Sequence, residues 1–397
     1  MNTVEEMKAK ERSTGKLYLE NLDSLRFFCF LVVFLFHSFH TEYAPIRENG
    51  IYQFVSKGLF GNGNLGVNFF FVLSGFLITL LLLKEKEVNE RINVGAFYLR
   101  RVLRIWPLFF FCVFFGFVIF PIAKTAFGQV AAETANPWYY IFFLSNIDYI
   151  RNGTDASVLS VLWSIGVEEQ FYLVWPLFFA FLPFRLYKFL FPVVLLVSIV
   201  FRYFNPAYSM LEFHTLSCIG DMAIGGLGGY LIYYSRRFKL WAENMPRAAI
   251  AGIYLGAVLI FFFRHQLLSH PLVLPFERAI IGVFFLGVLL EQSYARNSFF
   301  KLGRLKWAGH LGRISYGLYC LHFIGILIVT TLTARFGYND QLWQVIVLET
   351  LLALAVTIVI SQASYSFYEK PFLKLKNKFS VIKKSKSGYI FGPGITR

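Results

Sequence analysis

The chain has 397 residues, of which 57% are hydrophobic and 19% aromatic, whereas only 15% are charged. A soluble domain carries roughly 25% charged residues, so the composition excludes a water-soluble fold and indicates a protein with many membrane-spanning segments. The formal net charge is +15 at pH 7, but the basic residues stand in short loops between apolar segments. That placement is typical of topology signals and of attraction to anionic lipid, and it argues against a nucleic-acid-binding protein.

Ten apolar segments are long enough to cross a bilayer as helices, since a span needs about 20 residues. They lie at 22–42, 65–83, 104–122, 161–183, 188–204, 215–234, 248–264, 276–292, 313–334 and 342–366. The aromatic segment 138–150 is too short to span comfortably, and we expect it to be re-entrant or interfacial. The sequence therefore predicts an all-α polytopic membrane protein, a bundle of about ten transmembrane helices.

Lys and Arg are distributed unevenly between the two sides of this predicted bundle. Clusters such as those at 84–104 and 236–247 stand on one side, whereas the other side carries isolated cations. Because cationic loops of membrane proteins stay in the cytoplasm, the pattern predicts that both termini are cytoplasmic. We expect a cytoplasmic N-terminal segment at 1–20, a transmembrane domain at 21–370 and a basic cytoplasmic tail at 371–397.

The first apolar segment places ionisable side chains in the hydrocarbon region. Arg26 and His37 are eleven residues apart. On a helix they would lie nearly on one face, roughly 16 Å apart along the axis. Ionisable groups at such depth are costly and indicate a site, so we expect His37 to do proton chemistry. A hydrogen bond to a neighbouring helix would also explain His37, and Arg26 would also be explained by a pair with Asp23 or by contact with headgroups.

The segment 63–79 combines small residues, which favour close helix packing, with isolated polar side chains. Asn68 and Ser74 stand there among Phe, Leu and Val, and they are candidates for hydrogen bonds to a substrate or to His37. The ninth apolar segment contains a second intramembrane imidazole, His322, which is a further candidate for substrate binding.

Arginines are concentrated at the start of the third span. Arg101 and Arg104 are three residues apart and share a helix face, with Arg100 beside them. Arginine clusters match phosphate geometry, which favours a phosphorylated cofactor on the cytoplasmic side. Anchoring by the positive-inside rule remains an alternative explanation for all three.

The fourth span contains two adjacent carboxylates, Glu168 and Glu169, followed by Gln170. The helix dipole explains an acid in the first turn of a helix but not one two turns in, so these residues indicate catalysis or helix bridging. Trp163, Gln170 and Tyr172 are candidates for substrate binding on the same helix.

The sequence does not predict a metal site. The four cysteines stand in different apolar segments and form no CxxC pair, and His37 and His40 lack an evident third ligand.

Taken in order, these motifs resemble the membrane-bound acyltransferase type 3 family, whose bacterial members O-acylate surface carbohydrates and other small acceptors. The matching stretches cover about residues 20 to 375 and are the Arg26-x10-His37 pair, GNLGVNFFFVLSGFLIT, RRVLRIWP, LWSIGVEEQFYLVWP, SYGLYCLHF and YEKPF. The family usually has an acidic residue at the place of Asn68 and an arginine before the aspartate that matches Asp221, and this chain has neither.

The resemblance implies a multi-pass protein of the bacterial cytoplasmic membrane with acetyl-CoA, or another acyl-CoA, as a cytoplasmic donor. It also implies a hydroxyl acceptor on the outer side, a catalytic histidine at His37 and arginines that serve the donor at Arg26, Arg101 and Arg104.

We therefore expect an O-acyltransferase that moves an acyl group, acetyl in first place, to a hydroxyl of a cell-surface or lipid-linked carbohydrate. His37 would be the general base, Asn68 or Ser74 would steady the oxyanion, and Glu168 or Glu169 would bind the acceptor or fix the histidine tautomer. The alternative is a proton-coupled transporter, although the chain lacks the internal repeat of many transport folds. A structural assembly protein would leave the buried ionisable groups unexplained.

Overall fold

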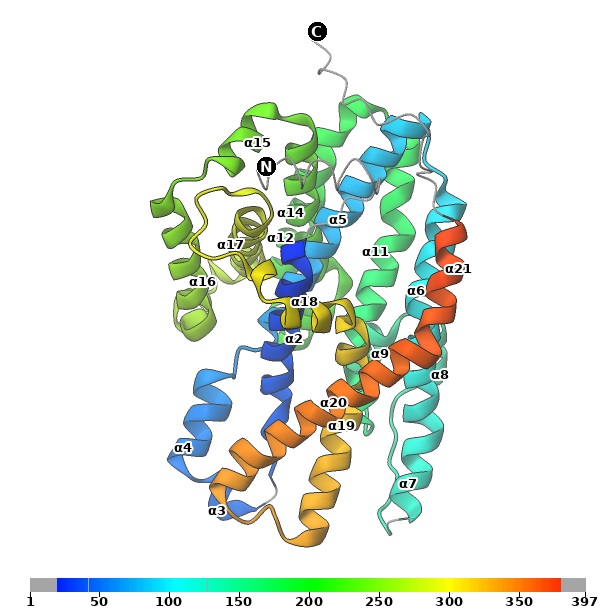
Figure 1. Ribbon diagram of the computed structural model, residues 1–397, viewed down its shortest axis with the longest axis vertical. Helices are drawn as coiled ribbons and strands as arrows, with labels where there is room; N and C mark the ends of the chain where they lie inside the picture. The colour runs from blue at the N-terminus through cyan, green and yellow to red at the C-terminus, as the bar shows by residue number, and fades with distance from the viewer. Residues whose placement is uncertain (1–19, 42, 127, 380–397) are drawn as a thin grey trace.

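The computed structural model describes residues 20–41, 43–126 and 128–379. Within these ranges every regular element is a helix, and many of the helices run along the long axis of the molecule (Figure 1). The predicted all-helical fold is therefore confirmed. The predicted N-terminal segment and most of the predicted basic tail lie outside the described residues.

Eight helical runs in the described part of the chain are long and apolar enough to cross a membrane. They are Asn21–Ser38, Leu65–Asn89, Val94–Ala126, Phe184–Phe204, Tyr208–Tyr234, Arg247–Leu268, Ser315–Phe336 and Gln344–Lys376. Each corresponds to a predicted span, so a multi-pass membrane protein is confirmed.

The other two predicted spans correspond to long helices that contain charged residues. Helix α11 (Leu162–Phe181) carries two glutamates near its centre, and α17 (Glu277–Tyr294) begins with a glutamate and an arginine. These charges lower the apolarity of both helices. The total of ten spans, which includes α11 and α17, stays a prediction.

The long elements are built from the helices α2 (Glu20–Ser38), α5 (Leu65–Asn89), α6 (Val94–Phe114), α7 (Phe120–Ala126), α12 (Tyr187–Phe204), α14 (Thr215–Tyr234), α16 (Arg247–Leu268), α19 (Ser315–Phe336), α20 (Thr350–Ala363) and α21 (Lys370–Lys378). Shorter helices connect them: α3 (Ala44–Arg47), α4 (Gly50–Gln53), α8 (Pro137–Ile141), α9 (Ser145–Asn152), α10 (Ser157–Ser160), α13 (Tyr208–Phe213), α15 (Arg236–Glu243) and α18 (Lys306–Arg313). Single π-helical segments interrupt or flank the longer helices at Phe54–Leu59, Phe115–Ile119, Gln344–Glu349 and Ser364–Glu369.

The aromatic segment that was predicted not to span folds into the two short helices α8 and α9. Asn136 caps the first by accepting a hydrogen bond from the backbone N–H of Trp138, and Pro137 fits the first helical turn, where its missing N–H costs nothing. Phe143 then adopts a positive φ of 56°, which separates the two helices. At five and eight residues, neither helix is long enough to cross a bilayer.

Helices α5 and α14 approach each other most closely where glycines face the opposite backbone. A Cβ atom on Gly75 would lie 2.0 Å from the carbonyl oxygen of Met222, and one on Gly225 would lie 1.9 Å from that of Val72. Only glycine permits this approach, as expected for helix packing in a membrane, where small residues let backbones come together. Helix α2 packs against α5 and α19, and this places its C-terminal turn inside the bundle.

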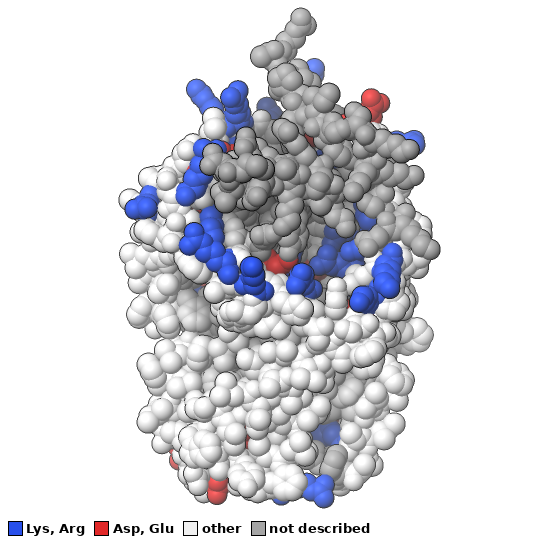
Figure 2. All heavy atoms as spheres, viewed as in Figure 1, with Lys and Arg blue, Asp and Glu red and all other residues white. Residues whose placement is uncertain are grey.

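Charged side chains are distributed unevenly over the surface. On the face shown in Figure 2, Lys and Arg gather toward the end of the molecule where α15 lies, and the broad band below them is mainly uncharged. Such a band is what a hydrocarbon core requires. The cytoplasmic location of the basic end stays a prediction.

Candidate active site

Two histidines from distant parts of the chain meet inside the bundle. His37 lies in the last turn of α2, and His322 lies on α19, where it is fully buried. Nδ1 of His37 is 3.0 Å from Nε2 of His322, and the two rings stack with their centroids 5.1 Å apart. We call these two residues the histidine pair.

A backbone carbonyl fixes the hydrogen positions in the histidine pair. Nδ1 of His322 lies 2.6 Å from the carbonyl oxygen of Tyr319, and because a carbonyl can only accept, this nitrogen carries the hydrogen. In neutral His322, Nε2 is then an acceptor, so Nδ1 of His37 must donate to it. Neutral His37 is thereby held in the tautomer whose Nε2 has a free lone pair, which is the form that a general base needs.

His37 lines a cavity of about 260 Å³, which we call the histidine cavity. It lies where parts of α2, α5, α9, α11, α13 and α19 come together, and its wall contains the polar and aromatic side chains of Asn64, Tyr149, Trp163, Tyr208, Glu212 and Tyr319. Trp163, a predicted substrate-binding residue, thus lies in the same cavity as His37. Ligand sites commonly combine an apolar lining with a few fixed polar groups, as this cavity does.

Tyr319, which lines the histidine cavity, has its hydroxyl close to that of Ser164. The phenol oxygen of Tyr319 is 2.7 Å from Oγ of Ser164, and it also donates to the carbonyl oxygen of Val161 at 3.3 Å. Tyr319 also supplies the carbonyl that orients His322, so one residue of α19 contributes both to the wall of the cavity and to the tautomer of the histidine pair.

Glu168 is connected to α5 and not to the histidine pair. Oγ of Ser74 donates to Oε1 of Glu168 at 2.7 Å, and the hydroxyl of Tyr172 donates to Oγ of Ser74 at 3.1 Å. Since Glu168 follows Trp163 by five residues on α11, it lies about 8 Å further along the helix axis than Trp163. The tautomer of His37 is fixed by His322, and three predicted site residues, Ser74, Glu168 and Tyr172, form a separate chain of hydrogen bonds.

Three of the four predicted donor-binding arginines lie close together, near Tyr172 at the end of this chain of hydrogen bonds. Arg104 lies close enough to Arg26 and to Arg101 for their like charges to repel each other, as Arg100 does to Arg101, and Tyr172 lies near both Arg26 and Arg101. The guanidinium of Arg101 lies 5.2 Å from the centre of the Tyr172 ring. We call Arg26, Arg101 and Arg104 the arginine cluster.

The arginine cluster contains hydrogen-bond donors that no carboxylate of the described residues contacts. Arg26 pairs with Asp23 at 2.7 Å, as its spacing predicted, but among the described residues no carboxylate forms an ion pair with Arg101 or Arg104. The Nε atom of Arg101 is buried and has no hydrogen-bond partner. A half-buried guanidinium with unused donors is suited to bind a phosphate.

Glu169 and Gln170 bridge helices. Oε2 of Glu169 accepts a hydrogen bond from the indole of Trp106 at 2.9 Å. The amide of Gln170 donates to Asn146 at 2.9 Å and accepts from Thr215 at 2.5 Å, so it ties α11 to α9 and α14. The structure thus places neither residue against the histidine pair.

Arg100 and Asn68 also have partners elsewhere. Arg100 forms an ion pair with Glu85 of α5 at 3.0 Å. The amide of Asn68 donates to Asp221 of α14 at 3.1 Å. Arg100 thus differs from Arg101 and Arg104 in having a carboxylate partner, and Asn68 lies against a carboxylate and not against His37.

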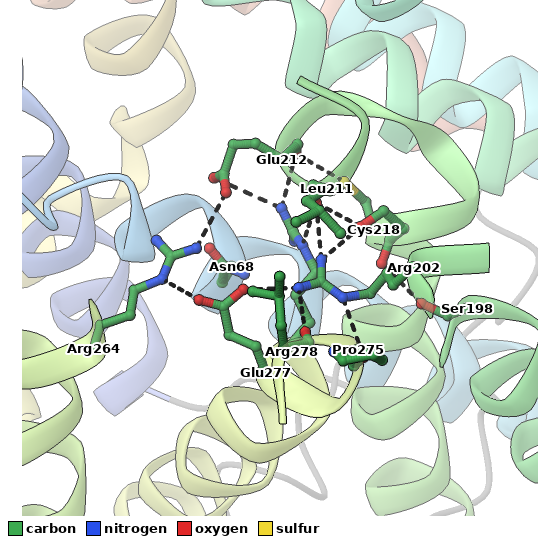
Figure 3. A network of polar contacts seen from close by, with 12 residues as sticks. Asn68, Ser198, Arg202, Leu211, Glu212, Cys218, Arg264, Pro275, Glu277 and Arg278 are labelled. Atoms are coloured by element: carbon green, nitrogen blue, oxygen red, sulfur yellow. Dashed lines mark hydrogen bonds and ion pairs between the residues drawn. The ribbon is translucent and has the colours of Figure 1, made fainter. Parts of the chain in front are cut away.

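A second group of buried charges was not anticipated from the sequence. Three arginines and three carboxylates at most 6% exposed lie together beside the histidine cavity, on α12, α13, α14, α16 and α17 (Figure 3). They are Arg202, Arg264, Arg278, Glu212, Asp221 and Glu277. We call these six residues the ion-pair network, and their formal charges cancel.

Each member of the network has a close partner of opposite charge. Glu277 accepts from Arg202 and from Arg264, both at 2.7 Å, and Arg278 donates to Asp221 at 2.6 Å. Glu212 accepts from Arg264 at 3.2 Å. Local structure favours this placement, because Glu277 begins α17 and Arg202 and Arg264 lie near helix C-termini, each at the end whose dipole suits its charge.

The sequence contained a signal for the network. Charged residues such as Asp221 and Arg278 stand inside or at the ends of apolar segments, where an ionisable group needs a partner. Which charges pair could not be derived, because the partners are up to 75 residues apart in the chain. Among the described residues, no group of three or more His, Cys, Asp or Glu side chains is placed to hold a metal ion.

Comparison with known proteins places these features in one family. The model of the acyltransferase domain family matches residues 19–365, nearly the whole chain. The chain is 27% identical over 388 residues to the peptidoglycan O-acetyltransferase OatA of Listeria monocytogenes, covering 93% of this chain and 58% of that protein. It is 26% identical over 405 residues to the O-acetyltransferase OatA of Staphylococcus aureus, covering 97% of this chain and 62% of that protein.

The chain is also 24% identical over 376 residues to a putative peptidoglycan O-acetyltransferase of Bacillus subtilis, YrhL, and the match covers 55% of that protein. The chain thus spans about three fifths of the length of these curated relatives. No solved structure matches it. The match to the family model confirms the resemblance found in the sequence, and the chain belongs to the acyltransferase family.

Proposed function

We propose that the protein is an O-acetyltransferase of the bacterial cytoplasmic membrane that moves an acetyl group from cytoplasmic acetyl-CoA to a hydroxyl of a cell-wall carbohydrate outside. Family membership supports acyl transfer, and the names of the relatives support peptidoglycan as the acceptor. The observation that carries the mechanism is the histidine pair, in which the contact of His322 with the Tyr319 carbonyl leaves Nε2 of His37 free to accept a proton.

The arginine cluster is the proposed binding site for the phosphates of the donor. Arg101 and Arg104 have donors that no carboxylate of the described residues occupies, and Arg26, which is paired with Asp23, lies near Arg104. Arg26 and His37 lie on the same helix, roughly 16 Å apart along its axis. Because the pantetheine arm of CoA separates its thioester from its phosphates, a donor bound at the arginines would present the thioester toward His37.

The chemical step follows from the free lone pair of His37. Nε2 takes the proton of the acceptor hydroxyl as its oxygen attacks the thioester carbon, and the carbon–sulfur bond then breaks. The thiolate of CoA leaves and takes the proton back from His37, so the products are the ester and free CoA. Asn68 and Ser74 donate to carboxylates in the structure, so we assign neither of them to the oxyanion.

Glu168 acts on the donor side in this proposal. Glu168 accepts a hydrogen bond from the hydroxyl of Ser74, which in turn accepts one from the hydroxyl of Tyr172. The guanidinium of Arg101 lies over the ring of Tyr172. We propose that this series of hydrogen bonds positions Arg101. The transporter alternative has no support from the family match, although the histidine pair by itself is compatible with a relay.

The test is turnover of acetyl-CoA by the purified protein in membranes, with His37→Ala as the decisive variant. A general base contributes roughly 10²- to 10⁴-fold to a rate, so we expect kcat to fall by at least about 100-fold with little change in KM for the donor. His322→Ala should lower kcat as well, because the tautomer of His37 is then no longer fixed. Wild-type rates in His37→Ala would overturn the mechanism.

A further inference from the structure

A carboxylate and an amide lie together in the wall of the histidine cavity, and the proposed chemical step uses neither. Glu212 and Asn64 both line this cavity with His37. The amide nitrogen of Asn64 donates to Oε1 of Glu212 at 2.8 Å, so the two side chains form one polar patch. Glu212 is the one carboxylate among the residues that line the cavity.

The ion-pair network holds Glu212 as an anion in a fixed orientation. Arg264 donates to its Oε2 at 3.2 Å, and Arg278 donates to its backbone carbonyl at 2.8 Å while its charge lies 3.7 Å from Oε1. Two arginines compensate the cost of keeping a carboxylate charged at 3% exposure. An ionised carboxylate only accepts hydrogen bonds, so the ligand groups that complement it are hydroxyls or amide N–H groups.

Aromatic rings form the neighbouring wall of the cavity around Phe213. The rings of Tyr149, Trp163 and Tyr208 all meet it edge to face, with centroid distances of 4.9, 5.0 and 6.0 Å. This packing fixes their orientations. Tyr208 is 63% exposed and therefore lies at the mouth of the cavity. Flat aromatic faces pack well against the C–H face of a sugar ring, while its hydroxyls require acceptors such as Glu212.

We infer that Glu212, with Asn64 and the aromatic rings around Phe213, forms an acceptor subsite for a sugar ring that carries hydroxyl or amide donors beside the reacting hydroxyl. The inference rests on the proposed function, because it assigns the same cavity to the hydroxyl that His37 deprotonates. The volume of about 260 Å³ is near the lower limit of ligand pockets, roughly 300 Å³, so the subsite holds one sugar ring and not a longer stretch of polymer.

The experiment measures binding of chitotriose to the purified full-length protein without donor, and then transfer of acetyl from acetyl-CoA to chitotriose. Loss of a charge-assisted hydrogen bond in Glu212→Gln should raise the Kd and the KM for chitotriose about tenfold. The KM for acetyl-CoA should not change.

Glu277→Gln is the matched control. It removes the same charge from the same network, but Glu277 does not line the histidine cavity. Both variants should lower the thermal unfolding temperature to a similar degree. In Glu277→Gln, however, Arg264 and Arg278 still contact Glu212, so the Kd for chitotriose should stay within about twofold of wild type.

Two results would overturn the subsite: absence of chitotriose binding to the wild-type protein, or equal shifts of the Kd in the two variants. The outcomes also separate this inference from the proposed function. Acetyl transfer that depends on His37 but not on Glu212 would leave the function intact and remove the subsite. Binding of chitotriose that depends on Glu212, in a protein that transfers no acetyl group, would do the reverse.

Discussion

Two groups of arginines lie inside this protein, and they differ in what surrounds them. In the ion-pair network, Arg202, Arg264 and Arg278 each lie within 2.7 Å of a carboxylate and are at most 5% exposed. In the arginine cluster, Arg101 and Arg104 form no ion pair within the described part of the chain, and Arg104 is exposed.

The difference separates charges that hold the fold from charges that are available to a ligand. A buried ion is tolerated only when an opposite charge and hydrogen bonds compensate it, and removal of one partner leaves the other buried and uncompensated. The network meets this condition from within the chain. The cluster meets it only in part: Asp23 pairs with Arg26, but Glu168, Glu169 and Glu369 act on Arg101 and Arg104 only from a distance. Donors of these two arginines are left for an anionic ligand, which is the reason to assign the cluster to the phosphates of the donor.

Arg278→Ala should have the largest effect on stability. The change leaves Asp221 buried beside Asn68 without its cation. Breaking a buried ion pair in this way costs about 3–5 kcal/mol, and we expect a large drop in the thermal unfolding temperature of the purified protein. The control is Arg278→Ala combined with Asp221→Ala, which leaves no charge unpaired and should recover part of the loss. Equal destabilisation by the single and double variants would show that lost packing, and not charge, dominates.

Arg101→Gln should have a smaller effect, and on binding instead of folding. Glutamine keeps a polar side chain but removes the charge that is proposed to meet a phosphate. We expect the KM for acetyl-CoA to rise about tenfold, with unfolding changed by less than about 1 kcal/mol because no carboxylate loses a partner. The KM of the wild type should also rise with salt, which screens the contact between charges. Destabilisation comparable to that of Arg278→Ala would contradict the distinction between the two groups.

The architecture was largely predictable because its signal is local. Runs of apolar residues gave the eight helices that qualify as spans, and the short length of 138–150 ruled it out as one. The prediction of two further spans included α11 and α17, whose buried charges make them less apolar. These charged residues pair with residues on other helices, and hydropathy averaged along the sequence contains no information about such contacts.

The site was predictable in its residues but not in their partners. His37 was identified from its depth in the first span, yet its partner His322 is 285 residues away and was expected to bind substrate. Asn64 and Glu212 were missed because both precede long helices, in positions where polar residues are ordinary. Only the packing of α5 beside α13 and α16 brings them to the histidine cavity, and no local pattern encodes that contact.

Arg100→Gln should have the smallest effect, and it tests where the arginine cluster ends. The sequence grouped Arg100 with Arg101 and Arg104, but in the structure its guanidinium pairs with Glu85 at 3.0 Å and is 21% exposed. Partly exposed ion pairs contribute about 0–1 kcal/mol, so the unfolding temperature should change little. The KM for acetyl-CoA should stay within about twofold of wild type, because a cation already paired with a carboxylate has less to offer a phosphate. A tenfold increase, as large as that in Arg101→Gln, would extend the donor site to Arg100 and show that pairing with a carboxylate does not separate the two kinds of arginine.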